Sequence, residues 1–473
     1  MRVDECRPVS RAEGAMNGLV KGALAVGGGA AVAEVMRRAL WPKPKPRYEP
    51  WERPPFSDFP NRVLILGGGF AGYTAAKTLC KMTRHRDDVG VMLISRDNYF
   101  TFWPMLPGVV SSDIDTKNVA QPLRRALIRL GASFRRADVK GIDLQKQCVR
   151  AEDKEFPYQH LIVALGGVPA YFGIPGVEEH AISMKGIGTA EAIRNRVIER
   201  YEETTLERGE VPNSKLTFVV IGGGATGVEV ASELHELVHE VLAPDYPNIN
   251  PRRVRVVLVD RNDQILKELD PALRRTARKK LADLQIEVIN NVKAQEITRG
   301  KVILDDGREL ETENAIWTAG FRASEKLDDL GLPHDERKGL KVDAYMRVEG
   351  YENVWGIGDC AANVDKDGEP VPPNAQAATQ EGRAVAKNVL AAIDGRELEP
   401  FDYKPLGQLV EMGSEFAVNE VLGIKFSGLM AALFWRMTYL YKLESPQSRA
   451  RIAADWFLDL FYRPAVTEIR DRG

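Results

Sequence analysis

A short apolar segment followed by closely spaced glycines occurs twice in the chain and constrains the fold more than any other feature. The first copy is Val63–Gly72 (VLILGGGFAG), in which Gly67, Gly69 and Gly72 have the G-x-G-x-x-G spacing. Its apolar residues predict a buried strand, and Tyr73–Met82 carries apolar residues at helical spacing. In a strand–turn–helix unit these glycines allow a tight turn, close approach of a pyrophosphate and close helix packing. We therefore predict a dinucleotide site where free backbone N–H groups begin the helix.

The second copy is Thr217–Gly227 (TFVVIGGGATG), which repeats the pattern. Gly222, Gly224 and Gly227 have the same spacing after an apolar strand, and Val228–Leu242 predicts the following helix. A lone glycine triplet is weak evidence. Two complete strand–glycine–helix units in one chain are strong evidence, and they predict two dinucleotide-binding domains.

The strand after each glycine unit ends differently. In dinucleotide folds an acid at this position binds ribose hydroxyls. The first such strand (GVMLIS) ends at Ser95, which can hydrogen-bond a ribose hydroxyl more weakly than an acid would. Asp97, two residues later, is the alternative ribose-binding residue. The second (RVVLVD) ends at Asp260, which suits NAD because a carboxylate repels a 2′-phosphate. The next residue, Arg261, has two interpretations. It could bind the 2′-phosphate of NADP, which would argue against NAD, or its side chain could simply be solvated.

Three further strand ends complete the predicted nucleotide sites. They are Leu161–Gly167 (LIVALGG) with Gly166, Ala315–Gly320 (AIWTAG) with Gly320, and Asn353–Cys360 (NVWGIGDC) with Gly358 and Asp359. In a flavoprotein with two nucleotides, an acid at the position of Asp359 reaches the ribityl chain of FAD.

The segment Tyr99–Pro107 (YFTFWPMLP) is dense in aromatic residues and proline, and it directly follows the strand that ends at Ser95. One interpretation is core packing. The other is a wall beside an isoalloxazine ring or an apolar substrate. The sequence leaves both open.

Composition limits the class of protein. The chain has 473 residues, 44% hydrophobic and 28% charged, which is typical of a globular protein with two or three domains. Its formal net charge of −2 gives no field that would attract nucleic acid. The four cysteines, Cys6, Cys80, Cys148 and Cys360, lie far apart without C-x-x-C or zinc-ligand spacing. We expect reduced thiols in an intracellular protein and no metal site.

The N-terminal segment differs from the rest of the chain. Met16–Trp41 is rich in Ala, Gly and Val, but its uncharged run Gly22–Ala33 is shorter than the roughly 20 residues of a membrane-spanning helix. Prolines from Pro42 to Pro60 then predict an extended linker. A loose tail and an accessory membrane anchor both remain open.

These segments, in this order, resemble the type II NADH:quinone oxidoreductases, a family of flavoprotein reductases with two dinucleotide-binding domains. The resemblance starts near Asn61 and runs to the C-terminus. It is carried by GGGFAG at Gly67–Gly72, YFGIPGVEEHA at Tyr171–Ala181, GGGATGVEVASEL at Gly222–Leu234, IWTAG at Ile316–Gly320, GIGDCA at Gly356–Ala361 and AQAATQ at Ala375–Gln380. The last motif fits the A-Q-x-A-x-Q pattern of that family, which other flavin reductases of the fold generally lack.

The resemblance implies an α/β fold with two Rossmann-like domains, which bind FAD and NAD(H), and electron transfer from NADH through FAD to a membrane quinone without proton pumping. It places Phe70 and Ala71 at the flavin nucleotide, Glu229 at the nicotinamide and flavin, and Gln376 and Gln380 in the quinone pocket. The alternative for Glu229 is stabilisation of the helix dipole. The alternative for the two glutamines is packing at the start of their helix.

The predicted domains are an N-terminal tail and linker (1–60), an FAD-binding domain in two parts (61–185 and 320–398), an NAD-binding domain (186–319) and a C-terminal membrane-associated region (399–473). In that last region Phe426–Trp435 and Met437–Tyr441 are apolar, are separated by Arg436 and have basic residues interspersed. Basic, aromatic-rich amphipathic helices lie in the membrane interface. We expect a peripheral protein on the cytoplasmic face of the cell membrane, or on the equivalent organelle inner membrane. A homodimer interface or a core lid is the alternative.

Two features depart from the family. Ser95 replaces an acid that many members have. Gly407–Ser414 (GQLVEMGS) carries Glu411 and Ser414 where members often have smaller or basic residues. These differences leave the type of quinone and its headgroup contacts open.

Other classes of protein share parts of this pattern. Sulfide:quinone oxidoreductases share the fold but need paired cysteines near the flavin, and Cys148 is a poor partner for Cys360. A disulfide reductase needs Cys-x4-Cys on the first helix, where Cys80 stands alone. Another pyridine-nucleotide-dependent flavoprotein reductase, or a redox-sensing protein that holds FAD without turnover, remains open.

Overall fold

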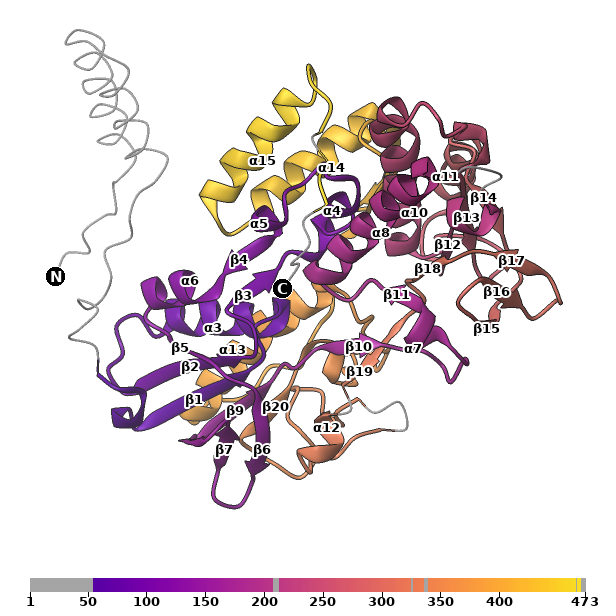
Figure 1. Cartoon of the computed structure of the whole chain (residues 1–473). Helices are drawn as coiled ribbons and strands as arrows, with labels where there is room; N and C mark the ends of the chain where they lie inside the picture. The colour runs from indigo at the N-terminus through magenta and orange to yellow at the C-terminus, as the bar shows by residue number, and fades with distance from the viewer. Residues whose placement is uncertain (1–53, 207–211, 325, 336–338, 465, 469–473) are drawn as a thin grey trace, which may run out of the picture. The chain divides into compact units, whose positions relative to one another are not determined.

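The computed structural model describes residues 54–206, 212–324, 326–335, 339–464 and 466–468 (Figure 1). The predictions for Met16–Trp41 and for most of the proline-rich linker therefore lie outside the described residues. Two five-stranded parallel sheets organise the described chain.

The first sheet is built around the first glycine unit. Its strand order is β20-β9-β1-β2-β5, with β1 at its centre. The bounds are β1 (Asn61–Leu66), β2 (Val89–Ser95), β5 (Ser133–Arg136), β9 (His160–Val163) and β20 (Val354–Gly356). The central residues Val63–Leu66 are fully buried, as expected for a parallel strand covered on both faces. The predicted strands before Gly67 and Ser95 are confirmed.

The second sheet repeats this plan around the second glycine unit. Its strand order is β11-β18-β12-β13-β14, again entirely parallel. The bounds are β11 (Ala181–Ser183), β12 (Thr217–Ile221), β13 (Arg255–Val259), β14 (Glu287–Ile289) and β18 (Asn314–Trp317). Because strands after a glycine turn and a helix return in parallel, their carboxyl ends lie along one edge of each sheet.

A three-stranded antiparallel sheet interrupts each unit before its returning strand. The first comprises β6 (Val139–Asp143), β7 (Cys148–Ala151) and β8 (Lys154–Pro157), and the second β15 (Ala294–Ile297), β16 (Lys301–Leu304) and β17 (Glu309–Glu311). Two antiparallel pairs complete this group: β3 (Tyr99–Thr101) with β4 (Ala120–Pro122), and β10 (Gly167–Pro169) with β19 (Phe321–Ala323). The β10–β19 pair joins segments that lie on either side of the second unit in the sequence.

The longer helices of the two units cover the sheets. They are α3 (Phe70–Met82), α8 (Ile187–Leu206), α10 (Ala225–His235), α11 (Pro271–Asp283) and α13 (Ala375–Ile393). The remaining helices of the two units are short: α4 (Gly108–Ser111), α5 (Thr116–Val119), α6 (Leu123–Leu130), α7 (Val177–His180), α9 (Asn213–Leu216) and α12 (Lys326–Asp329). The helix predicted over Val228–Leu242 starts earlier, at Ala225, and changes to a π-helix over Glu236–Leu242.

The C-terminal part contains three strands and two helices, and Figure 1 shows α15 beside α5 in the described unit. The elements are β21 (Gly407–Glu411), β22 (Ala417–Val421), β23 (Ile424–Gly428), α14 (Leu429–Lys442) and α15 (Pro446–Leu458). The three strands were not predicted from the sequence. Phe426 was expected in an apolar run that precedes Arg436, whereas it belongs to β23, and α14 continues through Arg436.

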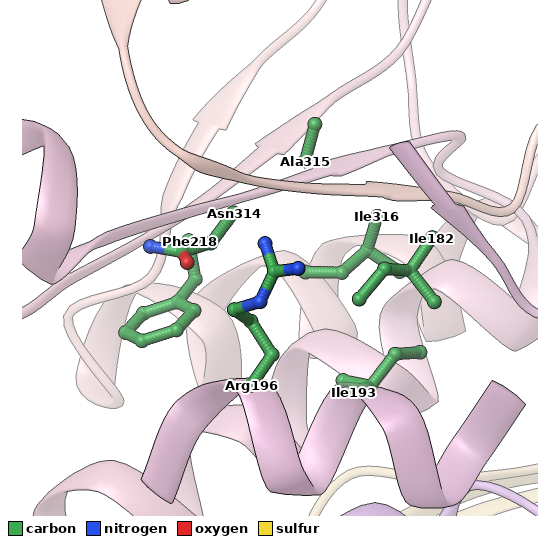
Figure 2. A pocket seen from close by; sticks show the side chains of 7 residues that line it. All are labelled: Ile182, Ile193, Arg196, Phe218, Asn314, Ala315 and Ile316. Atoms are coloured by element: carbon green, nitrogen blue, oxygen red, sulfur yellow. The ribbon is translucent and has the colours of Figure 1, made fainter. Parts of the chain in front are cut away.

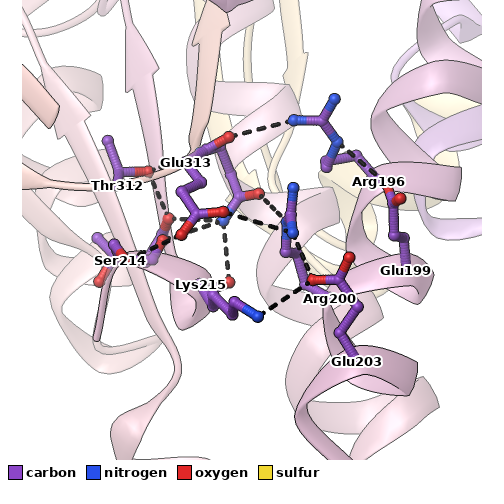
Figure 3. Close-up of polar contacts among 10 residues, drawn as sticks. Arg196, Glu199, Arg200, Glu203, Ser214, Lys215, Thr312 and Glu313 are labelled. Atoms are coloured by element: carbon purple, nitrogen blue, oxygen red, sulfur yellow. Dashed lines mark hydrogen bonds and ion pairs between the residues drawn. The ribbon is translucent and has the colours of Figure 1, made fainter. Parts of the chain in front are cut away.

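The amino end of the second sheet is closed by packing and ion pairs. Figure 2 shows a small hollow between α8 and the sheet. Its lining consists of Ile182, Ile193, Arg196, Phe218, Asn314, Ala315 and Ile316. In the neighbouring polar contacts of Figure 3, Arg200 forms ion pairs with Glu203 and Glu313. The lining residues and the ion pairs lie near the first residues of β12 and β18, where they fix α8 against the sheet. The opposite, carboxyl edge of the sheet is therefore left to the second glycine loop.

Candidate functional site

The first glycine loop joins β1 to α3 with a backbone that side chains would obstruct. Gly67 has a φ of +105°, and a Cβ atom built on it would lie 2.0 Å from the Ala164 carbonyl oxygen. A Cβ on Gly72 would lie 2.0 Å from the Gly67 carbonyl oxygen. Among the described residues, none comes within 4 Å of a Cβ on Gly69, the N-cap of α3, and no side chain caps this helix. Open space in front of free N–H groups fits a bound phosphate.

The second glycine loop, between β12 and α10, repeats this geometry. Gly222 has a φ of +119°, and a Cβ on Gly227 would lie 1.7 Å from the Gly222 carbonyl oxygen. Gly224 is the N-cap of α10, and in the described part of the chain nothing lies within 4 Å of a Cβ placed there. Gly320, at a φ of +97°, lies on the same edge of the sheet, with its Cβ position 3.1 Å from the Phe172 ring. The two loops therefore fit two dinucleotides.

The residues at the two strand ends lie beside their loops, as predicted. Asp260 is buried, and its carboxylate accepts hydrogen bonds from the backbone N–H groups of Gly223 and, at 2.7 Å, Asn262. Ser95 is half-buried, and its Oγ lies 2.9 Å from the Cβ position of Gly68. Asp260 thus fixes its own glycine loop. Its carboxylate oxygens keep lone pairs that can accept from a ribose hydroxyl.

A second group of predicted residues closes around the first loop. Gly358, at a φ of +72°, places its Cβ position 3.1 Å from Ala71, and its N–H donates to the buried Glu381 carboxyl of α13. Burial raises the pKa of Glu381 to about 7. Asp359 is half-buried, burial raises the pKa of its carboxyl, and no described residue donates a hydrogen bond to it. Gly166, at a φ of +70°, also faces open space within the described chain. This arrangement fits the flavin nucleotide.

The aromatic segment after β2 is mainly core. Phe100 and Phe102 are buried, and the Phe70 ring contacts Phe100 edge to face with 4.7 Å between centroids. The Phe102 ring lies 6.1 Å from that of Tyr439 on α14. Trp103 stays partly exposed. Core packing is therefore confirmed for the two phenylalanines, which connect the first glycine loop to the C-terminal helix.

Carboxyl groups line one face of α10 and its π-helical extension. Glu229 and Glu233 are buried, and Glu236 is half-buried. The Glu411 backbone N–H of β21 donates to Glu229 at 3.4 Å. Burial raises the pKa of Glu229 to about 8, and burial with the nearby Asp113 charge raises that of Glu236 to about 7. Burial also raises the pKa of Glu233 well above its ordinary value. Burial therefore favours the protonated form of Glu229 at neutral pH, which goes beyond a helix-dipole role for this residue.

The guanidinium of Arg436 on α14 faces this acidic group. It lies 3.6 Å from the Asp113 carboxylate and 3.5 Å from that of Glu411, and it stacks on the Trp456 ring at 4.8 Å. Trp456 Nε1 also donates to Asp113 at 2.8 Å. In the sequence Arg436 separates two apolar runs. Its side chain is only 17% exposed, because the buried carboxyls need a cation and α14 supplies it.

Gln376 and Gln380 lie on one face of α13, as their spacing predicts, but their amides contact backbone. The Gln376 side chain accepts from the Leu406 N–H at 2.7 Å and donates to the Gly407 carbonyl at 3.2 Å. Gln380 exchanges two hydrogen bonds with the Lys404 backbone, at 2.8 and 3.1 Å. The glutamines therefore fasten the segment that leads into β21, and each keeps an amide hydrogen for a further acceptor. Their place in a quinone pocket stays a prediction.

Sequence reasoning missed several residues of this region: Asp113, Glu233, Glu236, Glu381, Arg436 and Tyr439. One pattern could have found some of them, because Glu233 and Glu236 follow Glu229 at spacings of four and seven, which share a helix face. No local pattern joins Asp113 to Arg436, since tertiary packing brings them together.

Cys148 and Cys360 form no disulfide bond with each other in the described structure. Cys360 is fully buried, and its thiol contacts the Ile357 carbonyl oxygen at 3.2 Å. Cys148 lies in β7, in a different sheet from the strand that precedes Cys360. The geometry gives no support to the alternative that needs paired cysteines.

The C-terminal helices expose a large apolar surface. Its members are Leu429, Met430, Leu433, Phe434, Met437 and Tyr441 on α14, and Phe457, Leu458, Leu460, Phe461 and Tyr462 on or after α15. The residues on α14 follow helical spacing, so they form one face. Within the described ranges, no helix has both the length and the apolar character needed to span a bilayer.

Comparisons with known proteins agree with this geometry. Residues 61–382 match the model of the pyridine nucleotide-disulphide oxidoreductase family. The chain is 32% identical over 430 residues to the type II NADH:quinone oxidoreductase Ndh of Mycobacterium tuberculosis, covering 87% of this chain and 90% of that protein. It is 29% identical over 409 residues to the demethylphylloquinone reductase NdbB of Synechocystis, covering 85% of this chain and 96% of that one.

A solved structure shares the fold. The NDH2 of Plasmodium falciparum, solved in complex with NADH, superposes with a TM-score of 0.77 at 20% identity, covering 85% of this chain and 99% of that chain. The shared architecture therefore extends over nearly all of that protein, including segments beyond the two glycine units.

Proposed function

This chain belongs to the type II NADH:quinone oxidoreductases, within the pyridine nucleotide-disulphide oxidoreductase family, and we propose from this premise how its residues divide the transfer of electrons from NADH through FAD to a quinone. When bound, FAD supplies the redox chemistry, because it takes up the hydride of NADH and passes two electrons to the quinone. The protein supplies position, electrostatics and proton transfer.

The first unit holds FAD. The uncapped α3 amides behind Gly69 bind its pyrophosphate, and Ser95 binds the adenosine ribose. Asp359, which has no described hydrogen-bonding partner of its own, accepts from the ribityl hydroxyls. Gly166 and Gly358 leave room for the cofactor because their Cα positions carry no side chain, and Phe70 and Ala71 contact it from α3.

The second unit holds NADH. The α10 amides behind Gly224 bind the pyrophosphate, and Asp260 accepts from the adenosine ribose. Gly320 lies on the same edge of the sheet, where the Phe172 ring packs against it. A carboxylate next to a 2′-phosphate is a like-charge contact, so Asp260 favours NADH over NADPH.

The quinone side needs protons as well as electrons, since reduction to the quinol consumes two of each. The Glu229 carboxyl, with its pKa raised to about 8, carries a proton at neutral pH and lies against the backbone of β21. We assign Glu229 Oε as the proton-carrying group between the NADH groove and the quinone pocket. Gln376 and Gln380 shape the far wall of that pocket by holding residues 403–407.

The exposed apolar face of α14 and the residues around the end of α15 rest on the membrane surface and bring the pocket to its lipid-soluble substrate. Amphipathic surfaces of this kind bind in the bilayer interface without crossing it. We infer attachment to the leaflet that faces the NADH pool, which is the cytoplasmic face of a cell membrane or the equivalent face of an organelle inner membrane.

One observation carries the function: two glycine loops of the same geometry, each in front of an uncapped helix, occur in one chain with a buried acid, Glu229, on the second helix. The test is the anaerobic absorption spectrum of the purified yellow protein. NADH should bleach it and a soluble quinone should restore it. Bleaching by sulfide in place of NADH, or no recovery with quinone, would contradict the proposal.

Membrane attachment has its own test with phospholipid vesicles that contain anionic lipid. The double variant Leu433→Glu/Met437→Glu should lose vesicle binding while it keeps turnover with a soluble quinone, because both side chains are exposed. Leu206→Glu, an exposed site on α8, is the matched control and should bind normally. If the double variant binds vesicles normally but changes from dimer to monomer, the face is a dimer interface instead.

A further inference from the structure

Phe172 is an exposed aromatic residue held in an unusual conformation. Its side chain is 61% exposed, and its φ of +52° lies in the left-handed region, which bulky residues rarely adopt. Such positions persist where the surroundings hold them, often at functional sites. Here Trp317 Nε1 donates to the Ala170 carbonyl at 3.0 Å and Ser183 Oγ donates to the Tyr171 hydroxyl at 3.2 Å, so neighbouring residues fix the loop.

The Phe172 ring lies over the edge of the second sheet. One side of it contacts Gly320, whose Cβ position is 3.1 Å from the ring, and its centroid lies 5.9 Å from the guanidinium carbon of Arg261. Gly320 follows β18 and Arg261 follows β13, and the sheet order puts β12 between those two strands. The Phe172–Arg261 contact therefore extends across the carboxyl end of β12, where the second glycine loop begins.

Arg261 directly follows Asp260, the residue proposed to bind the adenosine ribose. The Asp260 carboxylate is fixed by the N–H groups of Gly223 and Asn262, whereas the Arg261 side chain is exposed. Among the described residues, Arg261 forms no ion pair, and its guanidinium makes a cation–π contact with the Phe172 ring. An acid at this strand end favours NADH, and an arginine nearby accommodates the 2′-phosphate of NADPH. The chain therefore carries both determinants side by side.

We propose that Phe172 is a specificity-determining residue, which holds the Arg261 guanidinium across the glycine loop and away from the adenosine ribose. One guanidinium cannot both stack on this ring and bind a 2′-phosphate beside Asp260. Phe172 thus withdraws the cation that would otherwise offset the repulsion between Asp260 and NADPH. This inference rests on the proposed assignment of the second unit to NADH, and it adds a residue from a distant loop to that selectivity.

The test compares two substitutions of Phe172. Phe172→Ala removes the aromatic face, and Phe172→Leu keeps apolar bulk without it, so both should release Arg261. An exposed cation–π contact limits the gain, so kcat/KM for NADPH relative to NADH should rise about two- to fivefold in both variants. The change should appear in KM. The double variants Phe172→Ala/Arg261→Ala and Phe172→Leu/Arg261→Ala should lose the gain, because the cation is then absent.

Binding of the unreactive nucleotides NADP⁺ and NAD⁺ provides a second readout. Trp317 lies 6.4 Å from Phe172 between ring centroids, so its fluorescence reports on occupancy of the groove. NADP⁺ affinity should rise two- to fivefold in Phe172→Ala, with little change for NAD⁺. An unchanged ratio of the two affinities, or a gain that survives loss of Arg261, would overturn the inference. These outcomes differ from failure of the proposed function, in which the unaltered protein would not oxidise NADH with quinone.

Discussion

The unit around Gly67 and the unit around Gly222 use the same backbone and surround it with different groups. In each, the N–H of the first glycine donates at 2.8 Å to the carbonyl oxygen of the adjacent strand, from Ile94 in one case and Val259 in the other. In each, the third glycine presses on the carbonyl of the first, and the middle glycine is open. The backbone conformation of both loops therefore depends on the glycine spacing alone.

The difference appears five residues after the middle glycine. In the first unit this position is Thr74, which lies against α13, because a Cβ on Gly382 would be 3.0 Å from the Thr74 Cβ and 2.5 Å from the Ala71 carbonyl oxygen. In the second unit it is Glu229, which meets the backbone of β21. Helix α3 is covered by α13, which packs directly on its backbone, as suits a cofactor that stays bound. Helix α10 instead carries a titratable group, Glu229, as suits a nucleotide that binds and leaves.

Gly227→Ala should have the largest effect, because its Cβ would collide with the Gly222 carbonyl at 1.7 Å. We expect a loss of about 3 kcal/mol in the free energy of unfolding, at the upper end for overpacking, and loss of NADH oxidation. Gly224→Ala is the matched control, since its φ of −73° suits alanine and its Cβ meets open space. It should fold normally and raise KM for NADH. Equal melting temperatures for Gly227→Ala and the unaltered protein would contradict the close packing of Gly227 on the Gly222 carbonyl.

Glu229→Gln should change how stability depends on pH. The folded pKa of about 8 is above the ordinary value of 4.5, so the folded state holds a proton that the unfolded state releases. The contribution of this carboxyl is full below pH 4.5 and is lost as pH rises towards 8. The variant should therefore gain stability over the unaltered protein between pH 5 and 8, by about 2 kcal/mol after allowance for water penetration.

The measurement is the melting temperature of both proteins from pH 5 to 8. Glu240→Gln, at an exposed site on the same π-helix, is the control and should parallel the unaltered protein. A constant difference between Glu229→Gln and the unaltered protein across this range would show that Glu229 is charged when folded, and the second unit would then lack its proton-carrying group.

Exchanging the strand-end residues tests which unit binds which nucleotide. Asp260→Ser should shift the ratio of kcat/KM for NADH over NADPH by about tenfold towards NADPH, which corresponds to about 1.4 kcal/mol. Part of the change will be a general loss of affinity, because Asp260 also holds Gly223. The reverse change, Ser95→Asp, should leave that ratio unaltered while flavin retention is kept. A ratio that responds to Ser95→Asp would mean that the two units are wrongly assigned.

Gln380→Ala should have the smallest effect, about 1 kcal/mol on stability, since it removes two hydrogen bonds to the Lys404 backbone near the surface. We expect slower flavin reoxidation by quinone and unchanged reduction by NADH in stopped-flow traces. Lys404→Ala is the control, because it keeps the backbone groups that Gln380 contacts. Slower reduction by NADH alone would assign this helix to the second unit.

The two sheets, both glycine loops and the sites of Ser95, Asp260 and Asp359 were predictable because each is encoded locally. Glycine spacing fixes the turns, and apolar runs fix the buried strands. The acidic group around Arg436 was not predictable. The contact of Trp456 with Asp113 joins residues 343 positions apart, and no local period reports such a meeting. The same limit explains why the contacts of Arg436 and the strands β21–β23 were missed.

The packing of α13 on α3 also sets an order for synthesis. The second sheet has all its strands once Trp317 has been synthesised. The first sheet is complete only after β20 (Val354–Gly356), and α3 is covered only after Gly382 of α13 has been synthesised. Because chains fold as they emerge from the ribosome, the later unit in the sequence can be completed before the earlier one. With the proposed assignment of the two units, flavin is enclosed late, and a nascent chain arrested between these points would hold a finished second unit and an incomplete first unit.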